Sequence, residues 1–159
     1  MSNKLVAYFS AGGVTARLAK TLADAIGADL YEIKPARPYS TPDLDWSNPK
    51  SRTSIECGDK AFRPEMADAA PDTARYDTVY IGFPIWWYTA PPIVKTFLES
   101  CDLKGKTVAP FATSGSSGMG DTARDLAPSC PGAVIAEGQR FPARAAADSL
   151  SAWAGKAGM

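Results

Sequence analysis

Four short apolar runs constrain the fold of this 159-residue chain more than any other feature. Each is too short for a helix and too continuous for a strand that is exposed on one face. Such runs predict strands covered on both faces, at Leu5 to Phe9, Val79 to Phe83, Val108 to Ala112, and Ala133 to Ala136. A fifth stretch, residues 28–34, alternates apolar and polar residues, which suits an edge strand.

Segments with helical spacing lie between these runs. Apolar residues recur every four positions from Val14 to Ile26, and Gly27 stands where a helix C-terminus favours positive φ. A second stripe begins behind Pro91 and Pro92, which fit the first turn of a helix. Weaker stripes cover residues 119–126 and the stretch from residue 146 onward. Strands alternating with helices predict an α/β fold with a parallel sheet.

Two places depart from this alternation. Six prolines interrupt residues 35–76, so we expect a long ordered loop there that carries Trp46, with a short helix somewhere in 53–70. Pro110 lies inside a predicted central strand, although proline cannot donate a hydrogen bond to the ladder. We keep the strand and expect the missing donor to face a gap beside a short neighbour.

Composition narrows the classes of function. The 17 basic and 17 acidic residues cancel, and no block of like charge indicates a nucleic-acid or membrane partner. No apolar stretch approaches the ~20 residues of a membrane span, and the start lacks the cleavage site of a secretory signal. We expect one domain over residues 1–159, in the cytoplasm. Zero net charge is compatible with a homo-oligomer.

The cysteines and the absence of histidine bear on chemistry. Cys57, Cys101 and Cys130 are odd in number and not spaced as CxxC, which argues against a disulfide framework and a metal site. The chain has no histidine, so a Ser-His-Asp or Cys-His nucleophile is excluded. If the protein is an enzyme, we expect no catalytic side chain and a bound cofactor that carries the chemistry.

Ligands of an open parallel sheet bind outside the carboxyl ends of its strands. The first such loop reads SAGGVTAR at residues 10–17, with hydroxyls at Ser10 and Thr15 and two glycines before a helix N-terminus. This composition favours a phosphate. The alternative is a tight turn whose glycines serve only backbone geometry. The spacing matches neither the P-loop nor the dinucleotide fingerprint. It also lacks the Cys-x5-Arg of low-molecular-weight phosphatases and the acidic cluster of receiver domains.

Two further loops would share that edge. Trp86, Trp87 and Tyr88 are consecutive at a strand end, where exposure is costly unless a flat partner such as an isoalloxazine ring covers them. The alternative is that two of them pack under the long loop. The third loop, TSGSSGMG from residue 113, has no bulk and could approach a ring edge closely. Together the loops describe a site for a phosphorylated planar ligand.

These residues resemble those of flavodoxin-fold proteins, in particular the short bacterial flavodoxin-like group. The matching stretches are YFSxxGxT from residue 8, DLDW at 43–46, SRTSIE at 51–56, GFPIWWYTAPP at 82–92 and PFATSGSSG at 110–118. The resemblance covers nearly the whole chain. It implies a three-layer, doubly wound fold with five parallel strands in the order 2-1-3-4-5, and noncovalent binding of FMN.

Carried over residue by residue, the resemblance implies three sets of contacts. The phosphate would meet Ser10, Gly12, Gly13, Val14, Thr15 and Ala16; the ring face would meet Pro84, Ile85, Trp86, Trp87 and Tyr88; the other ring edge would meet Ser114, Gly115, Ser116 and Gly118. The family pattern commonly has a hydroxyl residue where this chain has Gly12. The loss of that donor, worth about 1 kcal/mol, predicts weaker FMN binding.

The resemblance leaves three functions open. Flavodoxins proper are acidic one-electron carriers, and they keep a glycine in the ring-facing loop that helps to stabilise the one-electron-reduced ring. This chain is neutral and has no glycine at residues 84–90. We therefore expect an FMN-dependent oxidoreductase in which NAD(P)H is the electron donor and a quinone or similar small molecule is the acceptor, with Trp46 as a candidate lid. The alternatives are a one-electron carrier serving a redox protein, and a binding module with weak or no FMN binding.

Overall fold

The computed structural model describes residues 3–11, 13–45, 47–59, 61–68, 71–86, 90–113, 122–136, 138–142 and 144–157. Its strands are β1 (Lys4–Tyr8), β2 (Asp29–Glu32), β3 (Thr78–Pro84), β4 (Thr107–Thr113), β5 (Val134–Ile135) and β6 (Gln139–Phe141). Its α-helices are α1 (Val14–Ile26), α2 (Arg52–Gly58), α3 (Pro92–Glu99), α4 (Thr122–Leu126) and α5 (Ala147–Ala157). Two short 3-10 helices, η1 (Pro42–Leu44) and η2 (Ala127–Ser129), complete the list.

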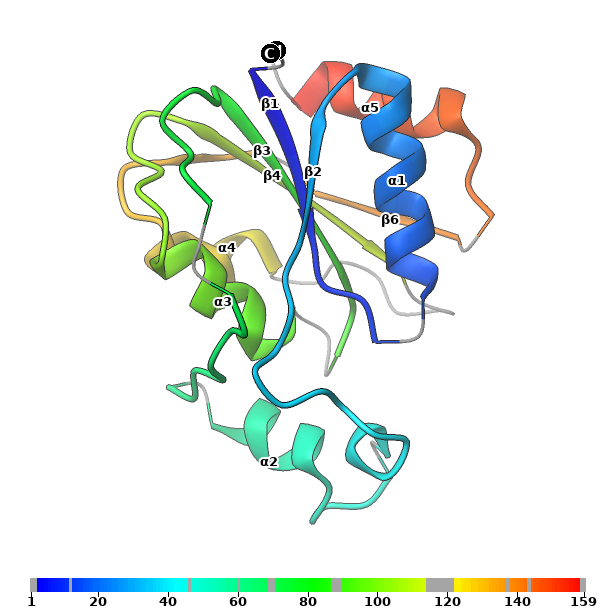
Figure 1. Cartoon of the computed structure of the whole chain (residues 1–159), viewed down its shortest axis with the longest axis vertical. Coiled ribbons are helices and arrows are strands. Elements are labelled where there is room, and N and C mark those ends of the chain that lie inside the picture. The colour runs from blue at the N-terminus through cyan, green and yellow to red at the C-terminus, as the bar shows by residue number, and fades with distance from the viewer. Residues whose placement is uncertain are drawn as a thin grey trace.

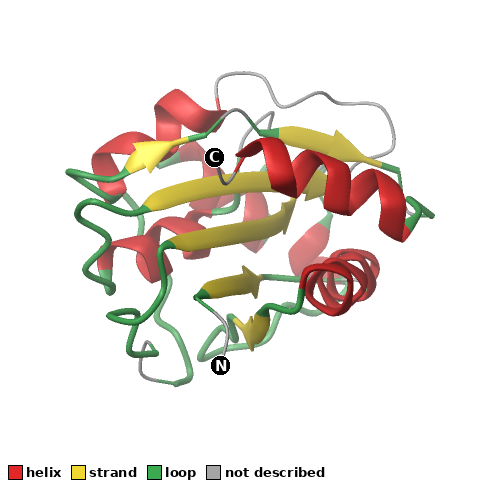
Figure 2. Cartoon of the chain, turned by 90° about the horizontal axis from the view of Figure 1, so that it is seen from above, coloured by secondary structure: helices red, strands yellow, loops and turns green. Residues whose placement is uncertain are grey.

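The strands form one parallel sheet in the order β2-β1-β3-β4-β5, and β6 pairs with β4 beyond β5. Helices α1 and α5 cover one face, and α3 and α4 cover the other (Figures 1 and 2). The predicted fold class and strand order are therefore confirmed. Strand β2 lies at the edge, as its alternating sequence predicts, and its residues are alternately half-buried and exposed.

Two apolar cores flank the sheet, because successive strand residues point to opposite faces. In β3, Val79 and Ile81 belong to the core under α3, whereas Tyr80 belongs to the core under α1 and α5. Phe111 and Trp153 meet in this second core with their ring centroids 5.8 Å apart. Both faces of the central strands are thus covered, as their continuous apolar sequences predict.

The predicted helix ends are also confirmed. Helix α1 buries Leu18 and Leu22 and ends at Gly27, whose φ of 67° is left-handed and whose N–H donates to the carbonyl of Ala23. Helix α3 has Pro92 in its first turn, with Pro91 directly before it. No helix among the described residues is long and apolar enough to span a membrane.

The last two strands differ from the sequence-based expectation. The run from Ala133 to Ala136 forms only the two-residue strand β5, and the next segment forms β6, which we had not predicted. Strand β6 has the sequence Gln139-Arg140-Phe141, and only its phenylalanine is buried. Three residues with one buried side chain give no recognisable pattern, so only pairing with β4 defines this strand.

Pro110 lies where its missing donor is tolerated. The carbonyls of Lys106 and Val108 accept hydrogen bonds from Val134 and Ala136, both at 2.8 Å, so even-numbered residues of β4 face β5 and β6. Pairing with β5 ends at Val108, and pairing with β6 starts at Phe111. Pro110 therefore faces the break between two short neighbours, as predicted.

Residues 36–65 form an insertion between β2 and β3. A bridge between Pro35 and Met66 closes its base, with Ala36 N–H donating to the Glu65 carbonyl at 2.8 Å. The insertion contains η1 and α2 and extends beyond the carboxyl edge of the sheet (Figure 1). The short helix predicted within 53–70 is α2, which begins one residue earlier because the Ser51 side chain caps it by accepting from Ser54 N–H.

Candidate functional site

The first loop shapes the start of α1. Gly13 precedes the helix with a φ of 90°, a left-handed conformation that favours glycine, and its N–H donates to Ser10 Oγ at 3.0 Å. No side chain among the described residues caps α1, and its first turn has no acidic residue. The first intrahelical bond runs from Arg17 N–H to the Gly13 carbonyl. The N–H groups of Val14, Thr15 and Ala16 thus precede the helical ladder, an arrangement that suits an anion.

Thr15 lies in this first turn, but its side chain points inward. The residue is 2% exposed, and its hydroxyl forms a hydrogen bond of 2.8 Å with the hydroxyl of Thr113, the last residue of β4. The Thr113 carbonyl also accepts from Ile85 N–H at 3.0 Å. Thr113 therefore links α1 to the residues after β3 and is the first residue of the third loop. The sequence placed Thr113 in that loop but assigned it no contact, because a hydrogen bond to a residue so distant in the chain gives no local signal.

The second loop begins with Pro84 at the end of β3, followed by half-buried Ile85 and Trp86. Trp86 packs edge-on against Phe9 and Tyr39, at centroid distances of 5.5 and 5.3 Å. Of the three aromatic residues predicted to face a ring, Trp86 therefore packs against the insertion, as in the alternative interpretation, and part of its side chain stays exposed. Trp87 and Tyr88 lie outside the described residues.

Tyr39 is fixed by charged groups of the insertion. Its hydroxyl donates to Glu56 Oε1 at 2.5 Å, and the Arg52 guanidinium carbon lies 3.8 Å from the centre of its ring. Arg52 Nε also donates to Glu56 Oε2 at 2.7 Å. Burial and the Glu56 carboxylate together raise the pKa of Tyr39 well above its ordinary value. Arg52 and Glu56 belong to SRTSIE, but the sequence alone did not connect them with Tyr39.

Several other predicted residues lie outside the described part of the chain. They are Gly12, the candidate lid Trp46, and the third-loop residues Ser114, Gly115, Ser116 and Gly118. The structure describes the ends between which the third loop runs, Thr113 in β4 and Thr122 in α4. Helix α4 is attached to α3 by an ion pair of 3.1 Å between Lys95 and Asp125.

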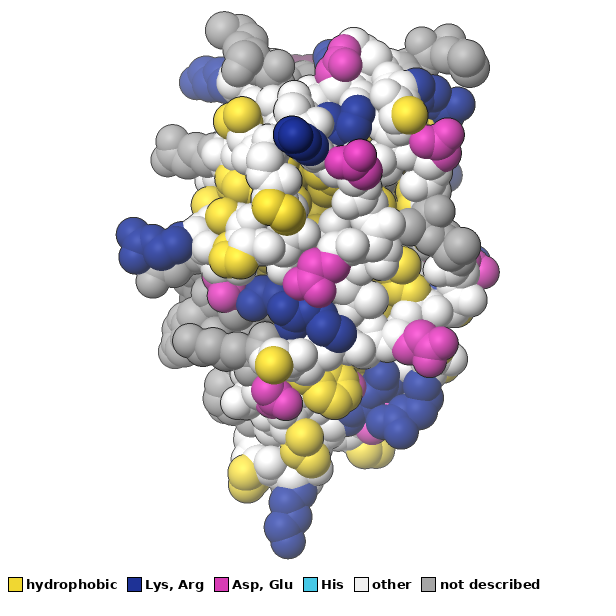
Figure 3. All heavy atoms as spheres, turned by 90° about the vertical axis from the view of Figure 1, so that its left-hand side faces the viewer, with side chains coloured by type: hydrophobic (Ala, Val, Ile, Leu, Met, Phe, Trp, Pro, Cys, Tyr) yellow, Lys and Arg dark blue, Asp and Glu magenta, His cyan; other side chains and the backbone are white. Residues whose placement is uncertain are grey.

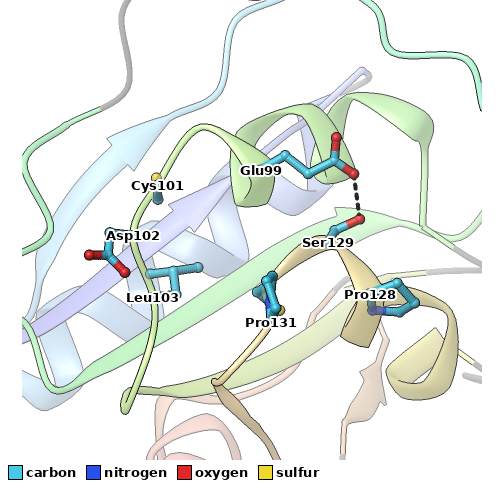
Figure 4. Close-up of a pocket in the computed structure, with 8 residues that line it drawn as sticks. Glu99, Cys101, Asp102, Leu103, Pro128, Ser129 and Pro131 are labelled. Carbon is cyan, nitrogen blue, oxygen red and sulfur yellow. Dashed lines mark hydrogen bonds between the residues drawn. The ribbon is translucent and has the colours of Figure 1, made fainter.

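Figure 4 shows a separate cavity of about 360 Å³ near the C-terminal end of α3. Its lining includes Glu99, which accepts a 2.8 Å hydrogen bond from Ser129. Helix α3 returns toward the amino ends of the strands, so this cavity lies at the end of the sheet opposite to the three loops (Figure 1). It contains none of the residues predicted to bind a ligand.

The cysteines offer little nucleophilic character. Burial raises the pKa of the Cys57 thiol to about 12 and that of Cys101 to about 11. Burial also raises the pKa of Cys130, whose Sγ donates to the Leu126 carbonyl. All three thiols are therefore protonated near neutral pH, which makes them poor nucleophiles.

Two solved structures are similar to this chain over most of its length. A protein from Bacteroides uniformis ATCC 8492, provisionally named a flavoprotein, is 46% identical, with a TM-score of 0.90 and coverage of 96% of this chain and 97% of its own. A flavoprotein from Lactobacillus acidophilus NCFM, solved in complex with FMN, is 25% identical, with a TM-score of 0.66 and coverage of 86% and 91%.

A curated relative matches a smaller part. The uncharacterized NAD(P)H oxidoreductase YcaK of Escherichia coli K12 is 30% identical over 73 residues, which are 45% of this chain. The match spans about a third of that relative, 32% of its length.

The family comparison covers nearly the whole chain. The sequence profile described as flavodoxin matches residues 3–157. The strand order β2-β1-β3-β4-β5 and the helices on both faces agree with that match. The chain therefore belongs to the flavodoxin family.

Proposed function

We propose that the protein binds FMN noncovalently at the carboxyl edge of its sheet and uses it to transfer electrons from NAD(P)H to a quinone or similar small, flat acceptor. The observation that carries the proposal is the junction at Thr113. Its hydroxyl bonds to Thr15 of α1, its carbonyl accepts from Ile85 N–H, and Thr113 itself is the first residue of the third loop. The three predicted ligand loops are thereby joined at one place.

The phosphate end fits the described residues. Gly13 is left-handed, none of the side chains that the structure describes caps α1, and no carboxylate in the first turn competes with an anion for the helix N-terminus. Ser10, beside this turn, adds a hydroxyl. In the proposed complex the phosphate accepts hydrogen bonds from Ser10, from the N–H groups of residues 14–16 and from the Gly12 backbone, while the Gly13 N–H holds the Ser10 oxygen in place. Because its side chain bonds to Thr113, Thr15 contributes its backbone N–H.

The ring end is assigned to the other two loops. Pro84 and Ile85 form the start of the loop that faces the ring, and Trp87 and Tyr88 cover one face of the ring. The edge of the ring is lined by the third loop, through Ser114, Gly115, Ser116 and Gly118. When bound, FMN would supply the chemistry of a two-electron carrier between the nicotinamide and the acceptor. The protein positions the reactants and excludes water, and none of its side chains is required as an acid or base.

Two relatives support the cofactor and the donor. The Lactobacillus acidophilus flavoprotein was solved with FMN, and this chain aligns with 91% of it. The name of YcaK specifies NAD(P)H oxidoreductase activity, over a match that spans a third of that protein. The first favours FMN as the ligand, and the second favours a nicotinamide donor.

Charge and loop sequence favour two-electron transfer over a carrier function. The chain is neutral overall, and acidic and basic side chains are interspersed over the face in Figure 3. Such a surface gives little long-range attraction to a charged redox protein. The absence of glycine at residues 84–90 removes the most flexible residue from the ring-facing loop.

Spectroscopy of the purified protein tests the proposal. We expect flavin absorbance in the protein as isolated or after addition of FMN, and conversion to the fully reduced form in one phase during photoreduction. NADH and NADPH should each be tried as reductant, followed by a quinone. Accumulation of a long-lived, long-wavelength-absorbing species would instead favour the one-electron carrier. No flavin bands in either sample would leave only the binding module.

A variant tests the orientation of the ligand. Ser10→Ala is expected to raise the Kd for FMN about tenfold, equivalent to ~1.4 kcal/mol, because it removes one hydroxyl from a charged phosphate. Riboflavin lacks the phosphate, so its Kd should be unchanged. Ser47→Ala, an exposed serine of the insertion, is the matched control. An equal loss for both ligands would contradict the assignment of this turn to the phosphate.

A further inference from the structure

Three aromatic side chains from distant parts of the chain form a cluster behind the second loop. Phe9, Tyr39 and Trp86 lie with their ring centroids 5.3 to 5.7 Å apart, and every pair is edge-on. Phe9 precedes Ser10 of the phosphate turn, and Trp86 belongs to the ring-facing loop. Tyr39 is the only member from the insertion. The insertion therefore contacts the starts of two ligand loops through one side chain.

Polar contacts hold Tyr39 in place on the side of the insertion. Glu56 is 3% exposed and accepts both the Tyr39 hydroxyl and Arg52 Nε. Arg52 also donates through Nη1 to the backbone carbonyls of Arg37 and Pro38, at 2.7 and 3.3 Å. Because these carbonyls directly precede Tyr39 in the chain, Arg52 fixes the backbone as well as the ring.

The loop that carries Trp86 is fixed at two points. The backbone N–H of Ile85 bonds to the Thr113 carbonyl, and the ring of Trp86 lies between Phe9 and Tyr39. These two contacts set the position of the chain up to residue 86. A shift of Tyr39 would release one of them.

We propose that Trp86 is the internal anchor of the ring-facing loop and that Tyr39, Arg52 and Glu56 are positioning residues that hold this anchor from behind. The inference rests on the proposed function, because it assigns the insertion a role in shaping the flavin site. It also changes the role of Trp86, which the sequence indicated as a direct contact of the ring. The direct aromatic contacts are then Trp87 and Tyr88.

The first experiment uses the protein without flavin. Glu56→Gln and Arg52→Lys are expected to change the near-UV circular dichroism, because the asymmetric packing of Trp86 against Tyr39 contributes to it. In a Trp86→Phe background the same substitutions should leave the remaining tryptophan signal unchanged. Far-UV circular dichroism checks that each variant is folded. An equal change in both backgrounds, or no change in either, would overturn the anchor role.

The second experiment measures flavin binding. Arg52→Lys should raise the Kd for FMN and for riboflavin by the same factor, about five- to tenfold, because it disturbs the wall of the ring site and leaves the phosphate turn intact. It should also shift the visible absorption bands of bound FMN. Tyr39→Phe, which keeps the ring, should retain more affinity than Tyr39→Leu.

The matched control is Arg63→Lys, a change at another arginine of the insertion, whose carboxylate partner is Glu99 of α3. It should leave both dissociation constants and the absorption bands unchanged. Equal effects of Arg52→Lys and Arg63→Lys, or an unchanged affinity in Arg52→Lys, would overturn the inference. If the wild-type protein binds no flavin, the proposed function fails, whereas the circular dichroism experiment still decides whether the insertion holds Trp86.

Discussion

The sheet and the insertion are held together by different forces. Each central strand is buried on both faces by apolar side chains, as in β3, where residues 78–83 are all buried. In the described part of the insertion, residues 36–65, the buried residues are Ser51, Thr53, Glu56 and Pro64, and three of these four are polar. The sheet is therefore stabilised mainly by removal of apolar surface from water, and the insertion mainly by directed polar contacts.

This difference matters for the candidate site. Apolar packing tolerates exchanges between apolar residues of similar volume, whereas hydrogen bonds and ion pairs tolerate neither a lost donor nor a wrong angle. The sheet thus supplies a rigid edge from which the loops extend. The insertion fixes the orientation of the Tyr39 ring, because its polar contacts hold this ring against Trp86. Four experiments test the contrast, in order of decreasing effect.

The largest effect is expected at Gly82 in the sheet. A Cβ added there would lie 2.3 Å from Phe111 Cζ, and Phe111 is its partner in the β3–β4 register. Because Phe111 is fully buried and packed against Trp153, its ring can shift only by displacing other core side chains. Gly82→Ala should lower the free energy of unfolding by about 3 kcal/mol, measured by urea denaturation.

Gly155→Ala is the control for Gly82→Ala. Gly155 lies in α5 with no atom within 4 Å of the added Cβ, so alanine should stabilise the protein by about 0.5 kcal/mol. Similar effects of the two substitutions on the free energy of unfolding would show that the contact between Phe111 and Gly82 is not the reason why alanine is unfavourable at residue 82.

The buried pair Thr15 and Thr113 tests a polar contact within the sheet region. Thr15→Val or Thr113→Val should each cost about 1–2 kcal/mol, because one hydroxyl loses its partner in a buried place. The double substitution to valine should cost less than the sum of the two, since both polar groups are removed. A double-mutant cycle in urea measures this coupling. Strict additivity would contradict a direct hydrogen bond.

The insertion should open without unfolding of the sheet. Ser51→Ala removes the side chain that caps α2 and should lower the protection of the α2 amides by about 1 kcal/mol in native-state hydrogen exchange. The amides of β1 and β3 should keep their protection. An equal loss in β3 would mean that sheet and insertion unfold as one unit.

The smallest effect is expected for the ion pair between Arg63 of the insertion and Glu99 of α3. Arg63 and, next, Ser129 hold the pKa of Glu99 below its usual value, so its contribution to stability is present above the unfolded pKa and is lost as pH falls through the folded pKa. The side chains of Arg63 and Glu99 are 32% and 40% exposed, which reduces this contribution to about 0.5 kcal/mol or less. Unfolding of wild type and Glu99→Gln from pH 6 to pH 3 should converge at the acid end.

Local pattern was sufficient for most of the fold. The continuous apolar runs of the central strands, the four-residue spacing of α1 and the glycine after it all correspond to elements in the structure. Even the conflict at Pro110 could be resolved from the sequence, since a donor can be missing only beside a gap. Strand β6 was not predictable, because its three residues become a strand only through pairing with β4.

For the site, the sequence by itself determined which loops share one edge, because a parallel sheet brings the carboxyl ends of its strands together. It also determined the turn at Gly13, whose glycine and serine specify a local backbone shape. Only the tertiary structure decided where the side chains of these loops point. Thr15 turns to Thr113 and Trp86 to Tyr39, and both partners are distant in sequence. A side chain's direction depends on the volume and polarity of its neighbours in space, which no local pattern contains.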